Sequence, residues 1–306
     1  MVLLDVQKAF DTVWTLKLTK IIQNFLEDRT HNPSIHIKQT PFSTHHIPAG
    51  VPQGSVLGPI LFNIYINDIS TSNKVHTDIY ADYTVLFTSK TATTNLQTHL
   101  NAVTDHFTNW KLTVNPDKTK AILFTFKKFP PPPCLTIPNQ QITWHKTVKY
   151  LGLQLDSKLT WKHAIQDRVR KTTHALKTLY PLIGRGPIPI AHKIHQYKAC
   201  ARPIPTYGAQ VWGTAATSHI LKAQRTQNKC LRTITGKNTD YNIKKLHSDT
   251  KTTFLVRHIN NFTKNTIHKL HQNPLVNSIA NYDINEIPLK NKTNYPKLPS
   301  TQLTSI

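Results

Sequence analysis

The sequence predicts an α+β fold, in which an antiparallel sheet with helices on one face is followed by a mainly helical region. Two observations support this prediction. Between residues 2 and 126 the hydrophobic periodicity changes in the order β-α-β-β-α-β, which is the pattern of a split β-α-β unit. Beyond the stiff run of prolines at 130–133, amphipathic helical patterns dominate.

The elements of the sheet domain follow from local patterns. Strands are expected where short apolar or alternating runs lie between loop residues, and helices where apolar residues recur at steps of three and four. In chain order the expected elements are a strand at 2–6, a helix at 10–25, β-like stretches at 35–38 and 41–47, a loop at 50–54, a helix capped by Gly54 or Ser55 that ends near 69, hairpin strands at 75–80 and 84–88, a helix at 96–110 and a strand at 121–126.

The second half is expected to be helical except near its start. One or two strands are expected within 146–156, and helices at 161–179, 189–200, 217–235 and 252–272. The last residues are polar and contain prolines, which disfavours a packed core. The expected domains are the sheet domain at 1–128, a proline linker with strands at 129–160, a helical region at 161–280 and a loose tail at 281–306.

The composition indicates a nucleic-acid-binding protein. The chain of 306 residues contains 38 Lys and Arg against 15 Asp and Glu, a formal net charge of +23. Such an excess attracts polyanions over a Debye length of roughly 8 Å at physiological salt. We favour nucleic acid over a membrane surface as the partner.

No membrane segment or secretion signal is expected. No stretch approaches the ~20 apolar residues of a membrane span, and the N-terminal apolar residues meet Asp5 too soon for a signal peptide. Cys134, Cys200 and Cys230 fit neither a zinc-finger spacing nor a disulfide framework. These features favour a reduced, intracellular compartment.

Two aspartates stand where a metal-dependent phosphoryl transfer would need them. Nucleotide addition uses two Mg²⁺ ions that clamp the attacking and leaving oxygens, and carboxylates from distant parts of a chain hold the ions. Asp5 ends the first expected strand, and Asp82 lies at the tip of the expected hairpin. The first strand should lie beside the hairpin, so the two carboxylates should converge. Taken singly, each aspartate is more typical of a helix cap or a turn.

Several longer motifs surround the two aspartates. In chain order they are LDVQKAFDTVW at 4–14, GVPQGSVLGP at 50–59 with LFN at 61–63, YADY at 80–83, WKLTVNPDKTK at 110–120, YLGL at 150–153 with Asp156, and QNK at 227–229 with Leu231, Arg232 and Ile234. They resemble motif A, motif B, the Tyr-Ala-Asp-Asp box, motif D, motif E and the region beyond the polymerase core of reverse transcriptases from non-LTR retrotransposons, particularly the jockey-like elements. The resemblance spans most of residues 1–235.

The resemblance implies an RNA-directed DNA polymerase, built as a right-hand polymerase palm at 1–128 and a thumb-like helical region. Its partners would be an RNA template, a DNA primer and deoxynucleoside triphosphates, with no membrane, and its cofactor would be Mg²⁺. Asp5 and Asp82 would be catalytic metal ligands, and the Val6 carbonyl would assist them. Lys118 would protonate the pyrophosphate leaving group.

Three further positions would bind substrate if the resemblance extends to them. Gln53 and Gly54 would contact the incoming nucleotide and its template partner, since a glycine permits close backbone approach. Phe10 would crowd a ribose 2′-OH and so select deoxynucleotides. Residues 150–153 would help to grip the primer terminus, and the basic residues beyond 133 would line a groove for the template–primer duplex through its phosphates.

Some of these positions have a second interpretation. Phe10 also fits a core position on the apolar face of its expected helix. Lys120 rivals Lys118 as the general acid, and either lysine could instead be solvated or contact phosphate. Residues 150–153 also fit an ordinary strand with a glycine bulge.

Two other groups of residues are expected to be structural. Asp11 is expected to form a charge pair near Lys8 or Lys17. Core positions are favoured over stacking on bases for the tryptophans Trp110, Trp144, Trp161 and Trp212.

Tyr83 stands where the family normally has a second aspartate. A tyrosine is neutral at pH 7, with an unperturbed pKa of ~10, and is a poor Mg²⁺ ligand. The site would then hold two carboxylates rather than three, and we expect strongly reduced or absent polymerisation. The chain opens only four residues before Asp5, so we also expect an N-terminally truncated copy that lacks the fingers segment and the endonuclease of full-length elements.

Three functions are compatible with these features. The first is an RNA-directed DNA polymerase domain, and the second is a catalytically dead basic remnant that still binds RNA or DNA. The third is a non-functional remnant that folds poorly. The motifs favour the first for the lineage, whereas Tyr83 and the missing fingers favour the others for this chain.

Overall fold

The computed structural model describes residues 1–27, 49–69, 71–88, 93–126, 130, 132–138, 140–184, 186–213 and 215–272. The chain divides into two compact units, residues 1–148 and 149–306. The β-like stretches expected at 35–38 and 41–47, and the tail at 281–306, lie outside the described residues.

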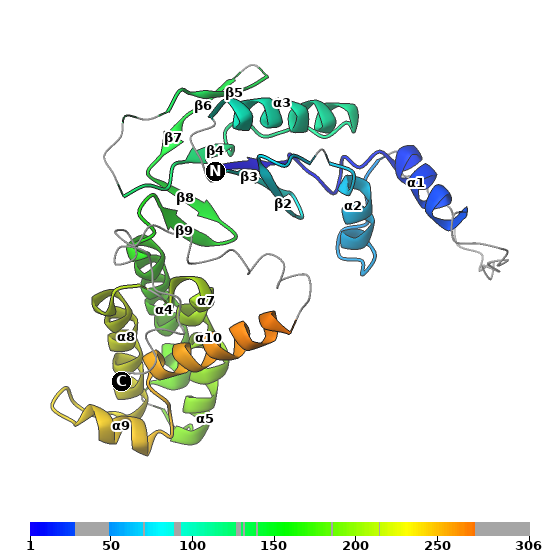
Figure 1. Ribbon diagram of the computed structural model, residues 1–306. Helices are drawn as coiled ribbons and strands as arrows, with labels where there is room; N and C mark the ends of the chain where they lie inside the picture. The colour runs from blue at the N-terminus through cyan, green and yellow to red at the C-terminus, as the bar shows by residue number, and fades with distance from the viewer. Residues whose placement is uncertain are drawn as a thin grey trace, which may run out of the picture. The chain divides into compact units, whose positions relative to one another are not determined.

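The first unit is built on a five-stranded sheet (Figure 1). Its strands are β1 (Val2–Asp5), β2 (His76–Tyr80), β3 (Tyr83–Phe87), β4 (Lys120–Ile122) and β7 (Trp144–His145), in the spatial order β2-β3-β1-β4-β7. β1 pairs antiparallel with β3 and β4, and β2 pairs antiparallel with β3, whereas β4 and β7 are parallel. The order of the first four strands is that of two interlocked split β-α-β units, so the predicted mixed fold with an antiparallel-rich sheet is confirmed.

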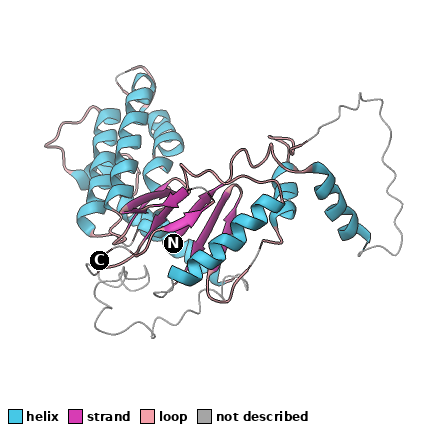
Figure 2. Ribbon diagram, turned by 90° about the horizontal axis from the view of Figure 1, so that it is seen from above, coloured by secondary structure: helices cyan, strands magenta, loops and turns pink. Residues whose placement is uncertain are grey.

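Helices complete the hydrophobic core of this unit. They are α1 (Thr15–Glu27), α2 (Gly58–Ile66) and α3 (Thr93–Asn109). Figure 2 shows α3 running across one face of the sheet. Leu96, Leu100, Val103 and Phe107 of α3 are buried in one cluster with Leu86 of the sheet, so the helical spacing of these residues predicted the buried face correctly.

Several boundaries differ from the predictions. α1 begins at Thr15 rather than at residue 10, because residues 7–12 form turns in which the N–H groups of Asp11 and Thr12 donate to the Lys8 carbonyl at 2.8 and 3.1 Å. α2 begins at Gly58, whose N–H donates to the Ser55 hydroxyl at 2.9 Å, and it ends at Ile66 rather than near 69. β4 spans three residues instead of six, and the hairpin of β5 (Leu135–Ile137) with β6 (Gln140–Ile142) was not predicted.

The second unit opens with a hairpin and continues as helices. β8 (Thr147–Tyr150) and β9 (Leu153–Asp156) form the hairpin, whose turn has positive φ at Leu151 (42°) and Gly152 (77°), as in a type I′ turn. The helices are α4 (Lys162–Ile183), α5 (Ile190–Gln196), the π-helix η1 (Tyr197–Ala201), α6 (Pro203–Thr206), α7 (Ala209–Trp212), α8 (Thr217–Thr235), α9 (Ile243–Asp249) and α10 (Leu255–His271). The predictions at 161–179, 189–200, 217–235 and 252–272 correspond to α4, to α5 with η1, to α8 and to α10, whereas α6, α7 and α9 were not predicted. None of the described helices is both long and apolar enough to cross a membrane.

Asp156 joins the hairpin to α4. Its carboxylate, which is 7% exposed, accepts hydrogen bonds from the N–H groups of Lys158, Thr160 and Trp161 at 3.1, 3.0 and 2.9 Å. The Thr160 hydroxyl donates to it as well, at 3.1 Å. The carboxylate therefore satisfies backbone donors at the start of a helix, where no helical carbonyl is available to them.

Asp156→Ala is expected to lower the free energy of unfolding by about 2–3 kcal/mol, because it leaves one buried and two partly buried N–H groups without their acceptor. Urea denaturation followed by tryptophan fluorescence checks this. The control is Asp240→Ala, which removes an exposed carboxylate and should change the free energy by less than about 0.5 kcal/mol. Equal effects of the two substitutions would contradict the proposed role of Asp156.

A buried polar network ties α8 to the start of α10. The Gln227 side-chain oxygen accepts from the Leu255 N–H at 2.7 Å, and the Gln224 side-chain oxygen accepts from the Val256 N–H at 3.3 Å. The two glutamines thus cap α10 from the neighbouring helix. They lie on the buried face of α8, together with Asn228 and a set of apolar residues.

His247 of α9 belongs to the same network. Its Nδ1 lies 2.7 Å from the Thr252 carbonyl and its Nε2 lies 2.9 Å from Asn228 Oδ1. The ring stacks on Phe254 with centroids 3.9 Å apart. Burial lowers the pKa of His247, and the hydrogen bond to Thr252 only partly opposes this.

We expect the stability of the protein to fall as the pH drops below about 6.5, the pKa of an unfolded histidine. Because the folded-state pKa of His247 lies lower, the unfolded chain takes up the proton first, and stability present above pH 6.5 is lost as the pH falls. Burial lowers the pKa values of His99 and His258 as well. Thermal melts at constant ionic strength check this, and an unchanged or higher Tm at pH 5.5 than at pH 7.5 would contradict it.

Candidate active site

Asp5 ends β1, the central strand of the five-stranded sheet. Its side chain is buried, and its carbonyl accepts from the Asn115 N–H at 2.7 Å. In the β1–β3 ladder Asp5 lies directly opposite Tyr83. Residues directly opposite each other in an antiparallel pair point to the same face. The position that carries tyrosine instead of aspartate therefore faces the same side as Asp5.

Asp82 lies in the two-residue turn between β2 and β3. The turn is closed by the pairing of Tyr80 with Tyr83, and the Asp82 carbonyl accepts from the Val6 N–H at 3.0 Å. Ala81 has φ of 51°, a positive value at the first central position, as in type II′ turns, where glycine is usual. An alanine there costs roughly 1–2 kcal/mol, and the pairing on both sides of the turn holds it in place.

The structure brings the two carboxyl groups within electrostatic reach of each other. Burial raises the pKa of Asp82, and the negative charge of Asp5 raises it further, while the Lys118 ammonium opposes the increase. Two like charges at close range favour protonation of one of them unless a cation separates them. The ends of β1 and of the hairpin thus form a site that attracts a cation.

Lys118 supplies a cation to this site. Its Nζ lies 3.2 Å from Asp5 Oδ1, and the hydrogen bond and charge of Asp5 raise the pKa of Lys118. Asn115 positions the lysine, because its side-chain oxygen accepts from the N–H groups of Asp117 and Lys118 at 3.1 and 3.3 Å. The rival candidate, Lys120, lies on β4 opposite Leu3. The structure therefore places Lys118, and not Lys120, at Asp5.

The carboxylate oxygens of Asp5 and Asp82 are of the type that binds a magnesium ion, but they are few. Asp5 Oδ1 is buried, and the Lys118 ammonium at 3.2 Å is its charged partner. Carboxylate oxygens are the ligands that Mg²⁺ prefers, and Mg²⁺ usually keeps several waters or substrate phosphates as its other ligands. In the part of the chain that the structure describes, no three His, Cys, Asp or Glu residues form a cluster that could hold a metal ion.

The loop that precedes α2 is fixed to the turn after β1. The Gly50 N–H donates to the Val13 carbonyl and the Val51 N–H to the Phe10 carbonyl, both at 2.8 Å. Gln53 Nε2 donates to Asp11 Oδ1 at 2.6 Å. The expected charge pair of Asp11 with Lys8 or Lys17 is therefore wrong, because Asp11 lies in a turn before α1, where Gln53 reaches it.

The other predicted substrate residues lie in or beside this loop. Gly54 has φ of 83°, a value that favours glycine, and among the described residues other than its chain neighbours no atom lies within 4 Å of where its Cβ would be. Phe10 lies outside α1 and stacks on Phe62 with centroids 4.9 Å apart. Among the described residues, Gln53 shares no hydrogen bond or ion pair with Asp5 or Asp82.

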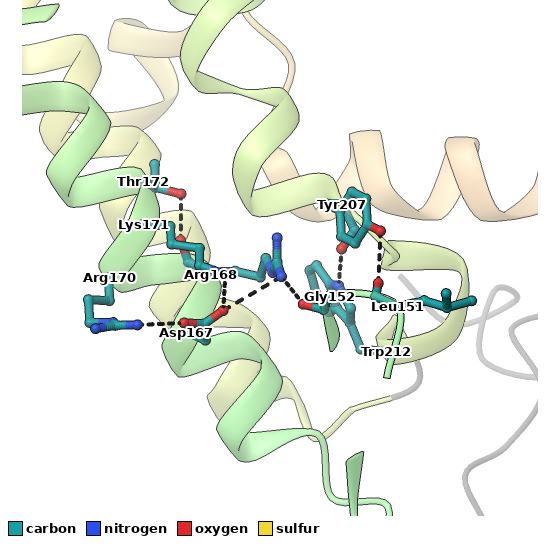
Figure 3. A network of polar contacts seen from close by, with 9 residues as sticks. All are labelled: Leu151, Gly152, Asp167, Arg168, Arg170, Lys171, Thr172, Tyr207 and Trp212. Atoms are coloured by element: carbon teal, nitrogen blue, oxygen red, sulfur yellow. Dashed lines mark hydrogen bonds and ion pairs between the residues drawn. The ribbon is translucent and has the colours of Figure 1, made fainter. Parts of the chain in front are cut away.

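The hairpin of the second unit is held by residues that the sequence analysis missed. The Tyr207 hydroxyl donates to the Leu151 carbonyl at 2.8 Å, and Arg168 Nη2 donates to the Gly152 carbonyl (Figure 3). The Arg168 guanidinium also lies over the Tyr207 ring, 4.7 Å from its centroid. One signal could have revealed Arg168, because it follows Ile165 by three residues on the buried face of α4, where an arginine needs a partner.

The tryptophans are largely structural. Trp110, Trp161 and Trp212 are buried, which confirms the expected core positions, and Trp144 is half-buried. The polar end of Trp212 is satisfied, since its Nε1 donates to the Tyr207 carbonyl at 2.8 Å (Figure 3).

The fold and the site define a class of protein. A split β-α-β sheet that brings an aspartate at the end of its first strand to an aspartate in the adjacent hairpin turn is the arrangement expected of a nucleotidyl-transferring polymerase. Residues 1–155 match the family model described as reverse transcriptase (RNA-dependent DNA polymerase). The chain belongs to the reverse transcriptase family.

Individual relatives agree with the motif resemblance. The chain is 31% identical over 302 residues to the RNA-directed DNA polymerase from mobile element jockey of Drosophila melanogaster, which covers 90% of this chain and 32% of the relative. It is 31% identical over 301 residues to the probable RNA-directed DNA polymerase from transposon X-element of the same species, with 90% and 33% covered. A jockey polymerase of Drosophila funebris is 32% identical over 258 residues, with 76% and 28% covered. The predicted resemblance to jockey-like elements is confirmed, and the chain spans about a third of the length of these curated relatives.

Proposed function

We propose that this chain carries the palm and a thumb-like region of an RNA-directed DNA polymerase, with the boundaries expected from the sequence. The single observation that supports this most is the meeting of Asp5 and Asp82 at the end of β1 and in the hairpin turn. The substrates would be an RNA template, a DNA primer and deoxynucleoside triphosphates. The tests are primer extension with these components and its dependence on the two aspartates.

Asp5 and Asp82, with the Val6 carbonyl, would hold Mg²⁺. When bound, the metal supplies charge stabilisation to the attacking and leaving oxygens of the nucleotidyl transfer. Lys118 would have to leave Asp5 for the metal to take its place, and its exposed side chain has the freedom to do so. In that position its ammonium could neutralise and protonate the pyrophosphate leaving group.

The loop at residues 50–54 would contact the incoming nucleotide. Gln53 would reach the nucleotide or its template partner after exchanging its hydrogen bond to Asp11, and Gly54 offers open space around its backbone. Phe10, stacked on Phe62, would form the wall that crowds a ribose 2′-OH. The hairpin turn at Leu151 and Gly152 would help to grip the primer terminus.

Tyr83 would weaken the metal site. With tyrosine opposite Asp5, two carboxylates remain to hold the ions, and the ion pair of Asp5 with Lys118 competes for one of them. We therefore propose that polymerisation by this chain is strongly reduced.

A second candidate function is nucleic-acid binding without catalysis. The observation that favours it is the loss of a carboxylate at position 83 in a chain whose second unit is strongly basic. The acidic residues in the described part of that unit are Asp156, Asp167, Asp240 and Asp249. Asp156 is occupied with backbone N–H groups, and Asp167 is neutralised by Arg170 and Lys171 at 2.9 and 2.7 Å.

Binding of an RNA–DNA hybrid is expected to weaken steeply with salt. The logarithm of the binding constant should fall linearly with the logarithm of the salt concentration, with a slope of about −0.9 per neutralised phosphate for B-DNA and a somewhat different slope for a hybrid. Fluorescence anisotropy of a labelled hybrid at several salt concentrations measures the slope. A binding constant that does not change with salt would contradict binding through phosphates.

A further inference from the structure

A cavity in the second unit is distinct from the two aspartates. It has a volume of about 570 Å³, which is within the range of ~300–1,000 Å³ typical of small-ligand sites. Its walls come from the turn of the β8–β9 hairpin, from η1 and α6, and from α10. The charged, amide-bearing and aromatic side chains that line it are Lys198, Arg202, Tyr207, Gln210, His258 and Phe262.

Within the part of the chain that the structure describes, no acidic residue pairs with the positive charges of the cavity. Arg202 is half-buried, and within the described residues its guanidinium forms no hydrogen bond or ion pair. The Lys198 ammonium donates one hydrogen bond to the Lys251 carbonyl, at 2.9 Å, and has two further N–H donors. His258 lies near enough for Arg202 to lower its pKa, in addition to the larger effect of burial. A half-buried arginine without an anion is costly, so the site favours an anionic ligand.

The same cavity offers aromatic surface. Tyr207 is 50% exposed and Phe262 is 40% exposed, and both line it. The Tyr207 ring is held in place by its hydrogen bond to Leu151 and by the Arg168 guanidinium over it (Figure 3). Exposed, fixed rings beside cations are typical of sites that stack a base and contact its phosphate.

The backbone is irregular where the cations emerge. Lys198 lies within the π-helix η1, and Arg202 is the first residue after the end of η1. π-Helical turns are rare and are frequent at functional sites. Both cations of this irregular turn line the cavity.

We propose that this cavity binds one nucleotide of a nucleic acid strand, with its phosphate on Arg202 and Lys198 and its base against Phe262 and Tyr207. The Gln210 amide, which has no partner among the described residues, is available to hydrogen-bond the base edge. The proposal rests on the proposed function in that it takes a nucleic acid strand as the ligand. It goes further by naming a single-nucleotide contact beside the hairpin that resembles motif E.

The test compares two ligands of equal length and charge with the full chain. One is a short oligothymidylate, and the other is an abasic phosphodiester chain. Fluorescence anisotropy should show that the wild-type protein prefers the base-bearing chain by about tenfold, as expected if a base stacks in the cavity. Oligouridylate in a third arm distinguishes an RNA strand from a DNA strand as the source of the nucleotide.

Two substitutions locate the effect. Phe262→Leu keeps apolar bulk but removes the ring. The variant should bind the base-bearing and abasic chains about equally well. Tyr180→Leu, which removes another exposed ring, on α4, should leave the preference unchanged. Arg202→Gln should weaken binding of both ligands by about tenfold, whereas Lys222→Gln, which removes an exposed charge on α8, should weaken it far less.

The outcomes separate this proposal from the proposed function. The nucleotide site would be overturned if the wild-type protein bound the base-bearing and abasic chains equally well, or if a folded Phe262→Leu variant still preferred the base-bearing chain. Either result would count even if primer extension were observed. A preference that depends on Phe262, in a chain with no extension activity even after repair of position 83, would support the site and count against the polymerase. Circular dichroism and a cooperative thermal transition establish that each variant is folded.

Discussion

Tyr83→Asp is expected to raise primer extension by about a hundredfold, the scale of rate that a misplacement of ~1 Å can cost. Position 83 lies directly opposite Asp5 in the β1–β3 ladder, so the new carboxylate would point to the same face as Asp5. A third carboxylate would strengthen divalent-ion binding and would help displace Lys118 from Asp5. Incorporation of labelled deoxynucleotides on an RNA template with a DNA primer measures the change.

The matched control for this substitution is Tyr83→Asn. It removes the same ring and introduces a side chain of the same shape as aspartate, but it adds no charge. We expect it to extend primers no better than the wild-type chain. Equal activities of the aspartate and asparagine variants would show that the missing charge at position 83 is not what limits this chain.

Asp5→Asn or Asp82→Asn, made in the Tyr83→Asp background, is expected to remove at least about a hundredfold of the extension activity, because a positioned metal ligand is lost. Neither change should unfold the protein. The ion-pair partner of Asp5 is a largely exposed lysine, and Asp82 lies in a turn whose closure depends on backbone hydrogen bonds.

The control for these substitutions is Asp78→Asn. Asp78 is an exposed acid on β2 of the same hairpin, paired with Val85 and away from the turn. The substitution removes one negative charge from the same hairpin, and primer extension should be unchanged within about twofold. A loss with Asp78→Asn as large as with Asp5→Asn would point to a general effect of charge rather than to metal ligation.

Elements whose burial pattern is local could be predicted from the sequence. α3 shows its apolar face at regular helical spacing, and α8 was predicted at the residues where it lies. The β2–β3 hairpin was predicted to within a residue or two, because a short turn separates two runs rich in β-branched and aromatic residues. The pairing of β1 with that hairpin followed from the split β-α-β order, and with it came the approach of Asp5 to Asp82.

Features that depend on contacts distant in sequence could not be predicted. The helical spacing before Thr15 suggested an earlier helix start, but the turn at Lys8, with φ of 46°, and the attached loop at Gly50 prevail there. The choice of Lys118 over Lys120 depends on how Asn115 fixes the chain beside β1.

The cavity beside the β8–β9 hairpin is a further example. It joins side chains from η1 and α10, whose sequence spacing carries no motif. No pattern in the sequence relates Arg202 to Phe262, because only the packing of the second unit brings their segments to one cavity.

The most direct test of the metal site is a titration with Mn²⁺, a spectroscopic substitute for Mg²⁺, followed by electron paramagnetic resonance. We predict that the wild-type chain binds Mn²⁺ weakly, that Tyr83→Asp binds it more tightly, and that Asp5→Asn and Asp82→Asn each abolish the binding. If both asparagine variants bound Mn²⁺ as tightly as the wild-type chain, then Asp5 and Asp82 would not share a metal ion.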